Sequence, residues 1–397
     1  MQRRDFIRQS GFSLAAIGAV GAAGNRFVSG QEEDEVANET NKTRQDETVV
    51  NKMPDYKSTG AKLLTDSTPT KDGFWFPAEW KPHEYTIMVM PSPQNWEGYG
   101  FTFDEVVEQW AEVANALAEF EPVLMVVRPE DKKLAQKHLG SEIEIMEFSV
   151  NDGWSRDIGP TFVVNGKGER RVAGCTFNGW GDKFEGMHKH DALLKGHLCK
   201  ALDVPMYPVN LVLEGGAIAL DGAGTIITTA QCMMNPNRNP GMTREAIDQL
   251  LNNAFGTKKV IWLDKGIEPD PITDGHIDGM AAFVDEGVVL LHSCDDKNDP
   301  NYKICRDAKK ILSEATDAKG RKFEIIDLPL HDGGHMNFYL GNGCVLVPIA
   351  DDPDEDDIPL GIIRELFDDR EVIGIGGHIL AEGGGGIHCI TQQVPKV

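Results

Sequence analysis

Short apolar runs alternate with amphipathic segments along most of the chain, and this alternation constrains the fold more than any other feature of the sequence. Residues 85–91 (YTIMVMP) and 122–129 (PVLMVVRP) are apolar runs bounded by prolines, as is typical of buried strands. Between them, residues 103–120 repeat apolar side chains such as Val106 and Trp110 at helical spacing, which predicts an amphipathic helix. Strands that alternate with helices in this way predict an α/β architecture.

Turn residues divide the middle of the chain into further elements. Residues 161–174 (TFVVNGKGERRVAG) and 216–229 (GAIALDGAGTIITT) hold an Asn-Gly or Asp-Gly pair between apolar runs, which predicts two β-hairpins. Residues 243–256 predict a helix with Thr243 as its N-cap and Gly256 as its stop signal. The order of the strands in their sheets is left open by the sequence.

The N-terminal part of the chain has a different character. Residues 1–30 begin with an arginine pair, Arg3 and Arg4, followed by a mild Ala- and Gly-rich run, and so resemble a twin-arginine export signal. The run is too short and too rich in glycine for a stable membrane span. Residues 31–72 are polar and predict a solvated linker, which leaves 73–397 as a single catalytic domain. We therefore expect a periplasmic or extracellular protein.

Charge and cysteine content exclude several classes of function. The formal net charge of −24 argues against a nucleic-acid partner and favours cationic small molecules, although such a charge also serves solubility alone. The 7 cysteines include no CxxC pair, so neither a zinc ribbon nor a dense disulfide framework is expected. An odd number leaves at least one thiol unpaired in a monomer.

Two polar motifs raise the question of a metal. Residues 351–357 (DDPDEDD) lack the spacing and the central glycine of an EF-hand loop, so we interpret them as a solvated loop rather than a calcium site. Residues 331–335 (HDGGH) place two imidazoles four positions apart, but the intervening glycines disfavour a helix and no third ligand is evident. We therefore predict no metal site.

Four segments place polar residues among glycines where strands should end. They are residues 151–160, 213–222, 273–279 and 383–395. In the last of them, Cys389 follows a run of glycines, which let a substrate approach a nucleophile closely.

The other three segments supply an acid–base group and several carboxylates. His276 can act as acid and base, and Asp278 lies two residues on, so that both side chains would share one face of a strand. Asp157 and Glu214 add two further carboxylates. This surplus fits a thiol protease poorly and fits a planar guanidinium well, because its paired N–H donors fork onto carboxylate oxygens.

These segments resemble those of the agmatine deiminase and bacterial peptidylarginine deiminase family, within the guanidine-modifying superfamily. The resemblance runs in family order from Trp154 to Pro395 through WSRDIGPTFV, FNGWG, VLEGGAIALDGAGTIITTAQCMMNPNRNPG, DGHIDGMAAFV, NFYLGNGCVLVP and GGGGIHCITQQVP. It implies a pentein fold, an α/β propeller with approximate fivefold pseudosymmetry built from ββαβ modules around a central pocket.

The resemblance also implies a role for each site residue. Cys389 matches the nucleophile and His276 the general acid/base. Asp157 and Asp278 match the two carboxylates that grip the guanidinium from opposite sides, and Glu214 matches the acid that hydrogen-bonds and orients the histidine.

Asn337 and Trp154 are further candidates for substrate binding that the resemblance suggests. The implied reaction is hydrolysis of agmatine, through an amidino-cysteine intermediate, to N-carbamoylputrescine and ammonia. This reaction is catalysed by a hydrolase that acts on C–N bonds of linear amidines, and it requires no metal or organic cofactor. It is a step of putrescine biosynthesis. A homo-oligomer is compatible with the sequence.

Two alternatives remain open at this point. An exported deiminase of peptidyl or free arginine would use the same chemistry, whereas a non-catalytic pentein would only bind a partner. Residues 331–336 (HDGGHM) and 182–190 (DKFEGMHKH) depart from the family pattern and are candidates for the substrate mouth.

Arginine substrates carry a carboxylate that calls for a basic ligand. Arg156 and Arg238 lie in stretches common to the family, while Arg170 and Arg171 lie in a predicted hairpin. This shortage of candidates favours agmatine.

Overall fold

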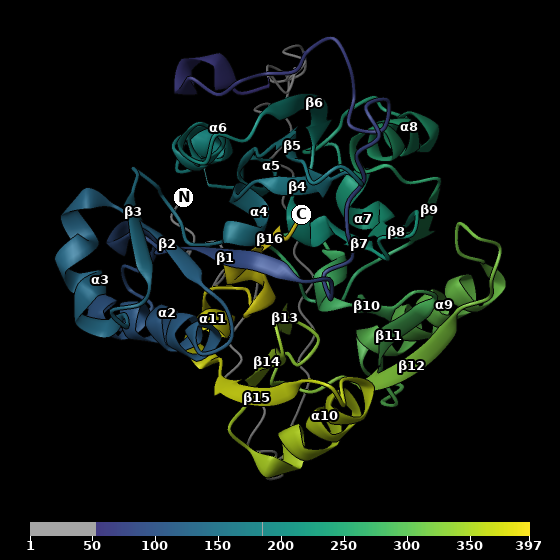
Figure 1. The fold of residues 1–397 in the computed structure, drawn as a ribbon. Coiled ribbons are helices and arrows are strands. Elements are labelled where there is room, and N and C mark those ends of the chain that lie inside the picture. Colours follow the sequence, from purple (N-terminus) through teal and green to yellow (C-terminus); the bar gives the residue numbers. More distant parts are fainter. Residues whose placement is uncertain (1–52, 185) are drawn as a thin grey trace, which may run out of the picture.

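Five small sheets surround a common centre in the computed structural model, which describes residues 53–184 and 186–397 (Figure 1). Four of the sheets have three strands each, in the order β4-β5-β6, β7-β8-β9, β10-β11-β12 and β13-β14-β15. Their strands are β4 (Thr161–Val164), β5 (Arg170–Thr176), β6 (Met206–Val212), β7 (Ile218–Leu220), β8 (Thr225–Thr229), β9 (Lys259–Leu263), β10 (Ala281–Asp285), β11 (Val288–Ser293), β12 (Glu324–Pro329), β13 (Tyr339–Gly341), β14 (Cys344–Ile349) and β15 (Glu371–Gly376).

Each of these sheets is built in the same way. The first strand runs antiparallel to the second, a helix follows, and the third strand returns parallel to the second. The connecting helices are α6 (Asp191–Ala201), α8 (Arg244–Phe255), α9 (Pro300–Glu314) and α10 (Pro353–Leu366). This repeated ββαβ unit is the module that the pentein prediction requires, and that prediction is confirmed.

The fifth sheet joins the two ends of the folded region. Its order is β16-β1-β2-β3, with β16 (Thr391–Pro395) antiparallel to β1 (His83–Val89) and β2 (Val123–Val127) and β3 (Glu144–Glu147) following in parallel. The helix α2 (Phe103–Ala118) crosses from β1 to β2. The last strand therefore takes the place of the first strand of a module, which closes the ring.

Most predicted elements form as expected. α2 begins with a capping box between Thr102 and Glu105 and buries Trp110 fully, as its helical spacing predicts. Both predicted hairpins form, as β4–β5 and β7–β8. α8 begins at its N-cap Thr243 and ends at Gly256, whose left-handed φ of 69° suits a residue without a side chain.

The remaining helices are short. They comprise α3 (Lys132–His138), α4 (Ser155–Ile158), α5 (Gly179–Asp182), α7 (Ala230–Met233) and α11 (His378–Glu382), together with the 3₁₀ turns η1 (Tyr56–Thr59), η2 (Pro93–Asn95), η3 (Pro129–Asp131), η4 (Gly215–Ala217), η5 (Ile277–Gly279) and η6 (His388–Ile390). No helix of the described residues is both long and apolar enough to cross a lipid bilayer.

Two predictions about polar segments are wrong. Within the predicted linker, residues 53–72 pack on the domain, where Tyr56 is buried and its hydroxyl donates to the carbonyl of Cys175 at 3.1 Å. The acidic run 351–357 is no loop, because α10 begins inside it with Asp352 as N-cap. Acidic side chains in a first helical turn are stabilised by the helix dipole, which explains a helix where the composition suggests solvation. The predicted export signal, 1–30, lies outside the described residues.

Candidate active site

A short turn precedes the first strand of each module, and these turns meet at the centre of the ring. α4 precedes β4, η4 precedes β7, η5 precedes β10 and η6 precedes β16. In space, α4 contacts both η4 and η6, and η4 contacts η5. The predicted site residues are distributed over these positions, with Asp157 on α4, Glu214 just before η4, His276 and Asp278 at η5, Asn337 just before β13, and Cys389 on η6.

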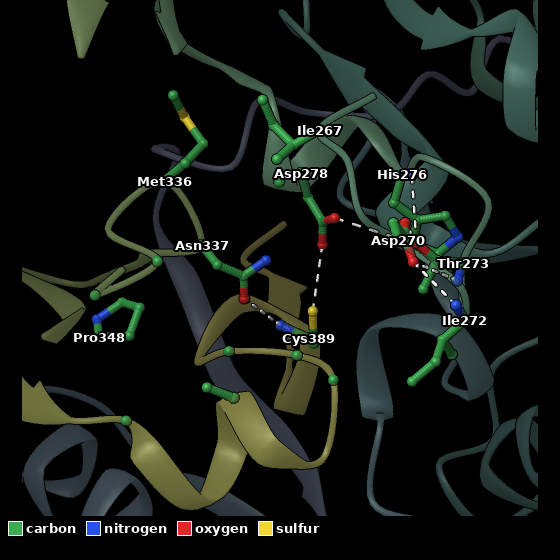
Figure 2. Close-up of a pocket in the computed structure, with 18 of the residues that line it drawn as sticks. Ile267, Asp270, Ile272, Thr273, His276, Asp278, Met336, Asn337, Pro348 and Cys389 are labelled. Carbon is green, nitrogen blue, oxygen red and sulfur yellow. Dashed lines mark hydrogen bonds and ion pairs between the residues drawn. The ribbon is translucent and has the colours of Figure 1, made fainter. Parts of the chain in front are cut away.

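Cys389 lies in a cavity of ≈ 270 Å³ together with His276, Asp278 and Asn337 (Figure 2). Its Sγ is 3.5 Å from Oδ2 of Asp278 and donates to it. Its backbone N–H donates to Oδ1 of Asn337 at 3.2 Å. Asn337 therefore positions the nucleophile through the backbone, while its side chain also faces the cavity.

His276 does not lie in a strand, as its spacing from Asp278 suggested, but is the residue before the 3₁₀ turn η5. The two side chains nevertheless point into the same site, with Nδ1 of His276 4.0 Å from Oδ1 of Asp278. Gly216 makes this approach possible, because a Cβ there would lie 2.6 Å from Nδ1 of His276 and 2.8 Å from Oδ2 of Asp278.

Asp157 is buried, with 4% of its surface exposed, and is absent from the described lining of the cavity. Its Oδ2 accepts from Nε1 of Trp180 at 2.8 Å, and its Oδ1 accepts from the backbone N–H of Gly216 at 3.0 Å. Each carboxylate oxygen can accept a second hydrogen bond, so the fixed group can still receive a guanidinium N–H.

Glu214 is brought beside His276, but its direct hydrogen bond goes elsewhere. Its Oε1 accepts from Nε of Arg238 at 2.6 Å, and its Oε2 has no hydrogen-bond partner among the described residues. Cys232 completes this buried group, since ligand atoms of Glu214, Cys232 and His276 all lie within 4.8 Å of one another. The guanidinium of Arg238 makes the group unfavourable for a cation. Cys232 thus lies beside His276.

His388 and Glu79 extend the site in a way that sequence reasoning missed. Nδ1 of His388 is 3.0 Å from Oδ2 of Asp278, and Nε2 is 3.0 Å from Oε2 of Glu79. Nη1 of Arg156 lies 3.2 Å from the same Glu79 carboxylate. The position of His388 beside Cys389 was its only sequence signal, and Glu79 had none.

Trp154 is absent from the described lining of the cavity. It is buried at 2% exposure and supports the glycine-rich loop, because a Cβ on Gly385 would lie 2.2 Å from its ring. An aromatic floor beneath consecutive glycines explains why no bulkier residue fits there.

The two segments that depart from the family pattern, 331–336 and 182–190, differ in their position relative to the cavity. Of the residues 331–336, Asp332, Gly333 and Met336 line the cavity, whereas 182–190 is absent from its described lining. The two histidines of HDGGH bind separate carboxylates instead of one metal: His331 lies 2.8 Å from Glu355 and His335 lies 2.7 Å from Asp356.

The cavity is acidic. Its described lining includes the carboxylates of Asp270, Asp278, Asp332 and Glu382 and holds neither lysine nor arginine.

The arginines considered for a substrate carboxylate are all engaged elsewhere. Arg156 contacts Glu79, Arg238 contacts Glu214, Arg170 pairs with Glu84, and Arg171 pairs with Glu169 at 3.0 Å.

Buried charges set the protonation states of the reacting groups. Burial, Asp278 and Asp157 raise the pKa of the Cys389 thiol well above its ordinary value. Burial lowers the pKa of His276, but Asp157 and Cys232 outweigh it and raise that pKa well above the ordinary value. The surroundings of both groups therefore favour their protonated forms when no substrate is bound.

The two aspartates respond in opposite directions to their surroundings. Burial raises the pKa of Asp278, but His388 and His276 outweigh it, so the pKa of this carboxyl is lowered and it stays anionic. Burial raises the pKa of Asp157, and the neighbouring Asp278 adds to that increase. A cation placed between the two would relieve their repulsion, which is what a guanidinium offers.

The ring of ββαβ modules, with a cysteine, a histidine and two carboxylates at its centre, defines the chain as a pentein of the guanidine-modifying class. More specifically, the chain belongs to the Porphyromonas-type peptidyl-arginine deiminase family, whose model matches residues 75–395.

Individual relatives cover nearly the same region. The chain is 37% identical over 373 residues to the agmatine deiminase of Medicago truncatula, covering 84% of this chain and 99% of that protein. It is 37% identical over 367 residues to the agmatine deiminase of Ectopseudomonas mendocina, covering 83% and 97%. The solved structure of the agmatine deiminase of Enterococcus faecalis superposes with a TM-score of 0.80 at 35% identity, covering 85% of this chain and 100% of that one.

Alkylation of Cys389 tests the electrostatics of the site. In Asp278→Asn one of the charges that raise the thiol pKa is removed, so the midpoint of the pH profile for iodoacetamide labelling should move to lower pH. Labelling is measured by mass spectrometry of the Cys389 peptide. Asp357→Asn removes an exposed carboxylate from α10 and is the matched control, with no shift expected. An unchanged midpoint in Asp278→Asn would refute the coupling between the two groups.

Proposed function

We propose that this chain is an agmatine deiminase, which hydrolyses agmatine to N-carbamoylputrescine and ammonia through an amidino-cysteine intermediate. The observation that carries the proposal is a partly buried cysteine, 3.5 Å from an anionic carboxylate, in an acidic cavity whose described lining holds no lysine or arginine. The agmatine deiminases among its relatives, at 35–37% identity over most of the chain, support the same substrate.

Substrate binding prepares the nucleophile. A guanidinium held by Asp157 and Asp278 adds a positive charge beside Cys389 and offsets the two charges that raise its pKa. The thiol then loses its proton to solvent more readily, so thiolate forms where its target carbon already lies.

The first half-reaction releases ammonia. The Cys389 thiolate adds to the guanidinium carbon and forms a C–S bond, which gives a neutral tetrahedral adduct. The imidazolium of His276 protonates the terminal nitrogen, the C–N bond breaks, and ammonia leaves. A positively charged amidino-cysteine remains beside a neutral His276.

The second half-reaction releases the product. Neutral His276 takes a proton from water while the oxygen adds to the amidino carbon. Collapse of this second adduct breaks the C–S bond and frees the ureido product, so Cys389 and His276 return to their starting states. Splitting one hydrolysis into two steps lowers each barrier, and positioned proton transfer contributes about 10²–10⁴-fold in rate.

The nucleophile assignment is tested by Cys389→Ala, which should abolish turnover while the circular dichroism spectrum and the melting temperature stay unchanged. Acid quenching of the wild-type reaction should trap the amidino adduct as a mass increase on the Cys389 peptide. Normal turnover in the variant would exclude Cys389 as nucleophile. Absence of turnover in the wild-type protein would instead favour a non-catalytic pentein that only binds a partner.

A substrate panel tests the choice of agmatine over the runner-up, a deiminase of peptidyl or free arginine. Agmatine, free arginine and a peptide with C-terminal arginine are offered, and ammonia and ureido product are measured. We expect kcat/KM for agmatine to exceed that for arginine by at least about 10²-fold, equivalent to ~2.7 kcal/mol of transition-state binding. Faster turnover of the peptide than of agmatine would identify the protein as a peptidyl-arginine deiminase instead.

We also propose that the protein is exported by the twin-arginine route, on the strength of the arginine pair in residues 1–30. Fusing this segment to a reporter that is active outside the cytoplasm only if it folds before export should yield external activity. Lysine at both Arg3 and Arg4 should abolish it. Export that persists in the double-lysine variant would contradict the proposal.

A further inference from the structure

His292 places an unused hydrogen-bond acceptor at the cavity. It lies near the end of β11, lines the cavity and is only 2% exposed. Its Nδ1 is 3.1 Å from the carbonyl oxygen of Leu328. A carbonyl can only accept, so Nδ1 carries the ring proton. Burial lowers the pKa of His292 to about 4, so the ring is neutral and Nε2 bears a free lone pair.

Nothing in the described protein uses that lone pair, because Nε2 makes no hydrogen bond to another described residue. The ring nitrogens of a histidine with so little exposed surface are normally satisfied by hydrogen bonds in folded proteins. Its position at the cavity indicates that a donor on a bound molecule completes its hydrogen bonding.

Asp332 adds a negative charge to the lining of the same cavity. It lies in the lining between His331 and His335, whose bonds to Glu355 and Asp356 tie this loop to α10. Asp332 itself is exposed and forms no ion pair within the described residues. By contrast, Asp270 is already engaged, since its carboxylate accepts backbone N–H groups at 2.8–3.1 Å.

The topology places both residues at the same end of two neighbouring parallel strands. In the parallel pairing of β11 with β12, His292 is opposite Leu328. Two residues after Leu328, the backbone N–H of Leu330 donates to the carbonyl of Ser293 at 2.8 Å, and the loop with Asp332 follows directly. The ends of β11 and β12 therefore present an acceptor and an anion at one side of the cavity.

We propose that His292 and Asp332 form a subsite for a protonated amine, which holds the end of the substrate distant from the guanidinium. This inference rests on the proposed function and identifies what selects agmatine. A primary ammonium has three N–H donors and a compact positive charge, which an acceptor nitrogen and a carboxylate satisfy together. The α-carboxylate of an arginine would meet a lone pair and a like charge at the same place, so the subsite also rejects anionic substrates.

The test compares agmatine with 1-butylguanidine, which keeps the guanidinium and the four-carbon chain but lacks the ammonium. Asp332→Asn should lower kcat/KM for agmatine by at least about 10-fold, as is typical for loss of a hydrogen bond to a charged group. The same variant should leave kcat/KM for 1-butylguanidine within about 2-fold of the wild-type value, because this compound has no ammonium for Asp332 to bind.

Variants at His292 provide a second, independent measurement. His292→Phe retains an aromatic ring without an acceptor and should reduce the ratio of kcat/KM for agmatine to that for 1-butylguanidine. His292→Gln retains an acceptor oxygen and should restore part of that ratio. Asp357→Asn, which removes an exposed carboxylate on α10, is the matched charge control and should leave the ratio unchanged. Equal losses for both substrates, or no loss for agmatine, would overturn the subsite.

Binding to the Cys389→Ala protein separates failure of the subsite from failure of the proposed function. Calorimetric titration should show tighter binding of agmatine than of 1-butylguanidine, and Asp332→Asn in this background should abolish the difference. If the wild-type protein turned over neither compound, the proposed function would fail, while this selectivity would still support the subsite. Equal affinity for both ligands in Cys389→Ala would overturn it.

Discussion

The antiparallel pairing of β16 with β1 holds the architecture together, because it turns five modules in a row into a closed ring. Gln393 of β16 is opposite Thr86 of β1, so the pairing joins segments at the two ends of the folded region. The turn η6, with Cys389, directly precedes β16. Closing the sheet and delivering the nucleophile to the centre are therefore one structural event. The same rule applies around the ring, where the first strand of each module carries a turn inward and each turn brings one or two polar groups.

Such a centre concentrates negative charge in a place from which water is largely removed, and the protein balances it unevenly. His388 lowers the pKa of Asp278 and so keeps this carboxyl anionic. Burial and Arg156 lower the pKa of His388, but Glu79 and Asp278 outweigh them, so that the pKa of His388 is raised. Asp157 has no such cationic partner beyond His276, and its pKa is raised. The site is thus incompletely neutralised, and a cationic substrate completes it. This accounts for substrate recognition and thiol activation by one interaction.

Much of this arrangement could be predicted from the sequence. Apolar spacing identified α2, Asn-Gly and Asp-Gly pairs identified two hairpins, and glycine-flanked polar residues identified Cys389 and His276. These signals are local, since each depends on residues a few positions apart.

What could not be predicted depends on contacts that only the closed ring creates. Glu79 carries no local signal, yet it lies 3.0 Å from His388, more than three hundred positions away in the chain. Cys232 likewise carries no local signal, yet it lies beside His276. Trp154 shows the opposite case, because its sequence neighbourhood is that of a site residue while its ring packs against the glycine-rich loop. The packing of residues 53–72 was missed because polar composition was taken as a sign of solvation.

The absence of a side chain at Gly216 has a consequence for how proteins of this type can diverge. Any larger residue would place a carbon 2.6 Å from the ring of His276 and 2.8 Å from the carboxylate of Asp278. The spacing of these two groups therefore cannot be adjusted gradually by substitution at that position, and the reaction chemistry is insulated from drift there. Residues 331–336, which form part of the mouth and are tied down through α10, carry no such restriction at Asp332. Evolution can then change which molecules are accepted at the rim while the centre continues to perform the same reaction.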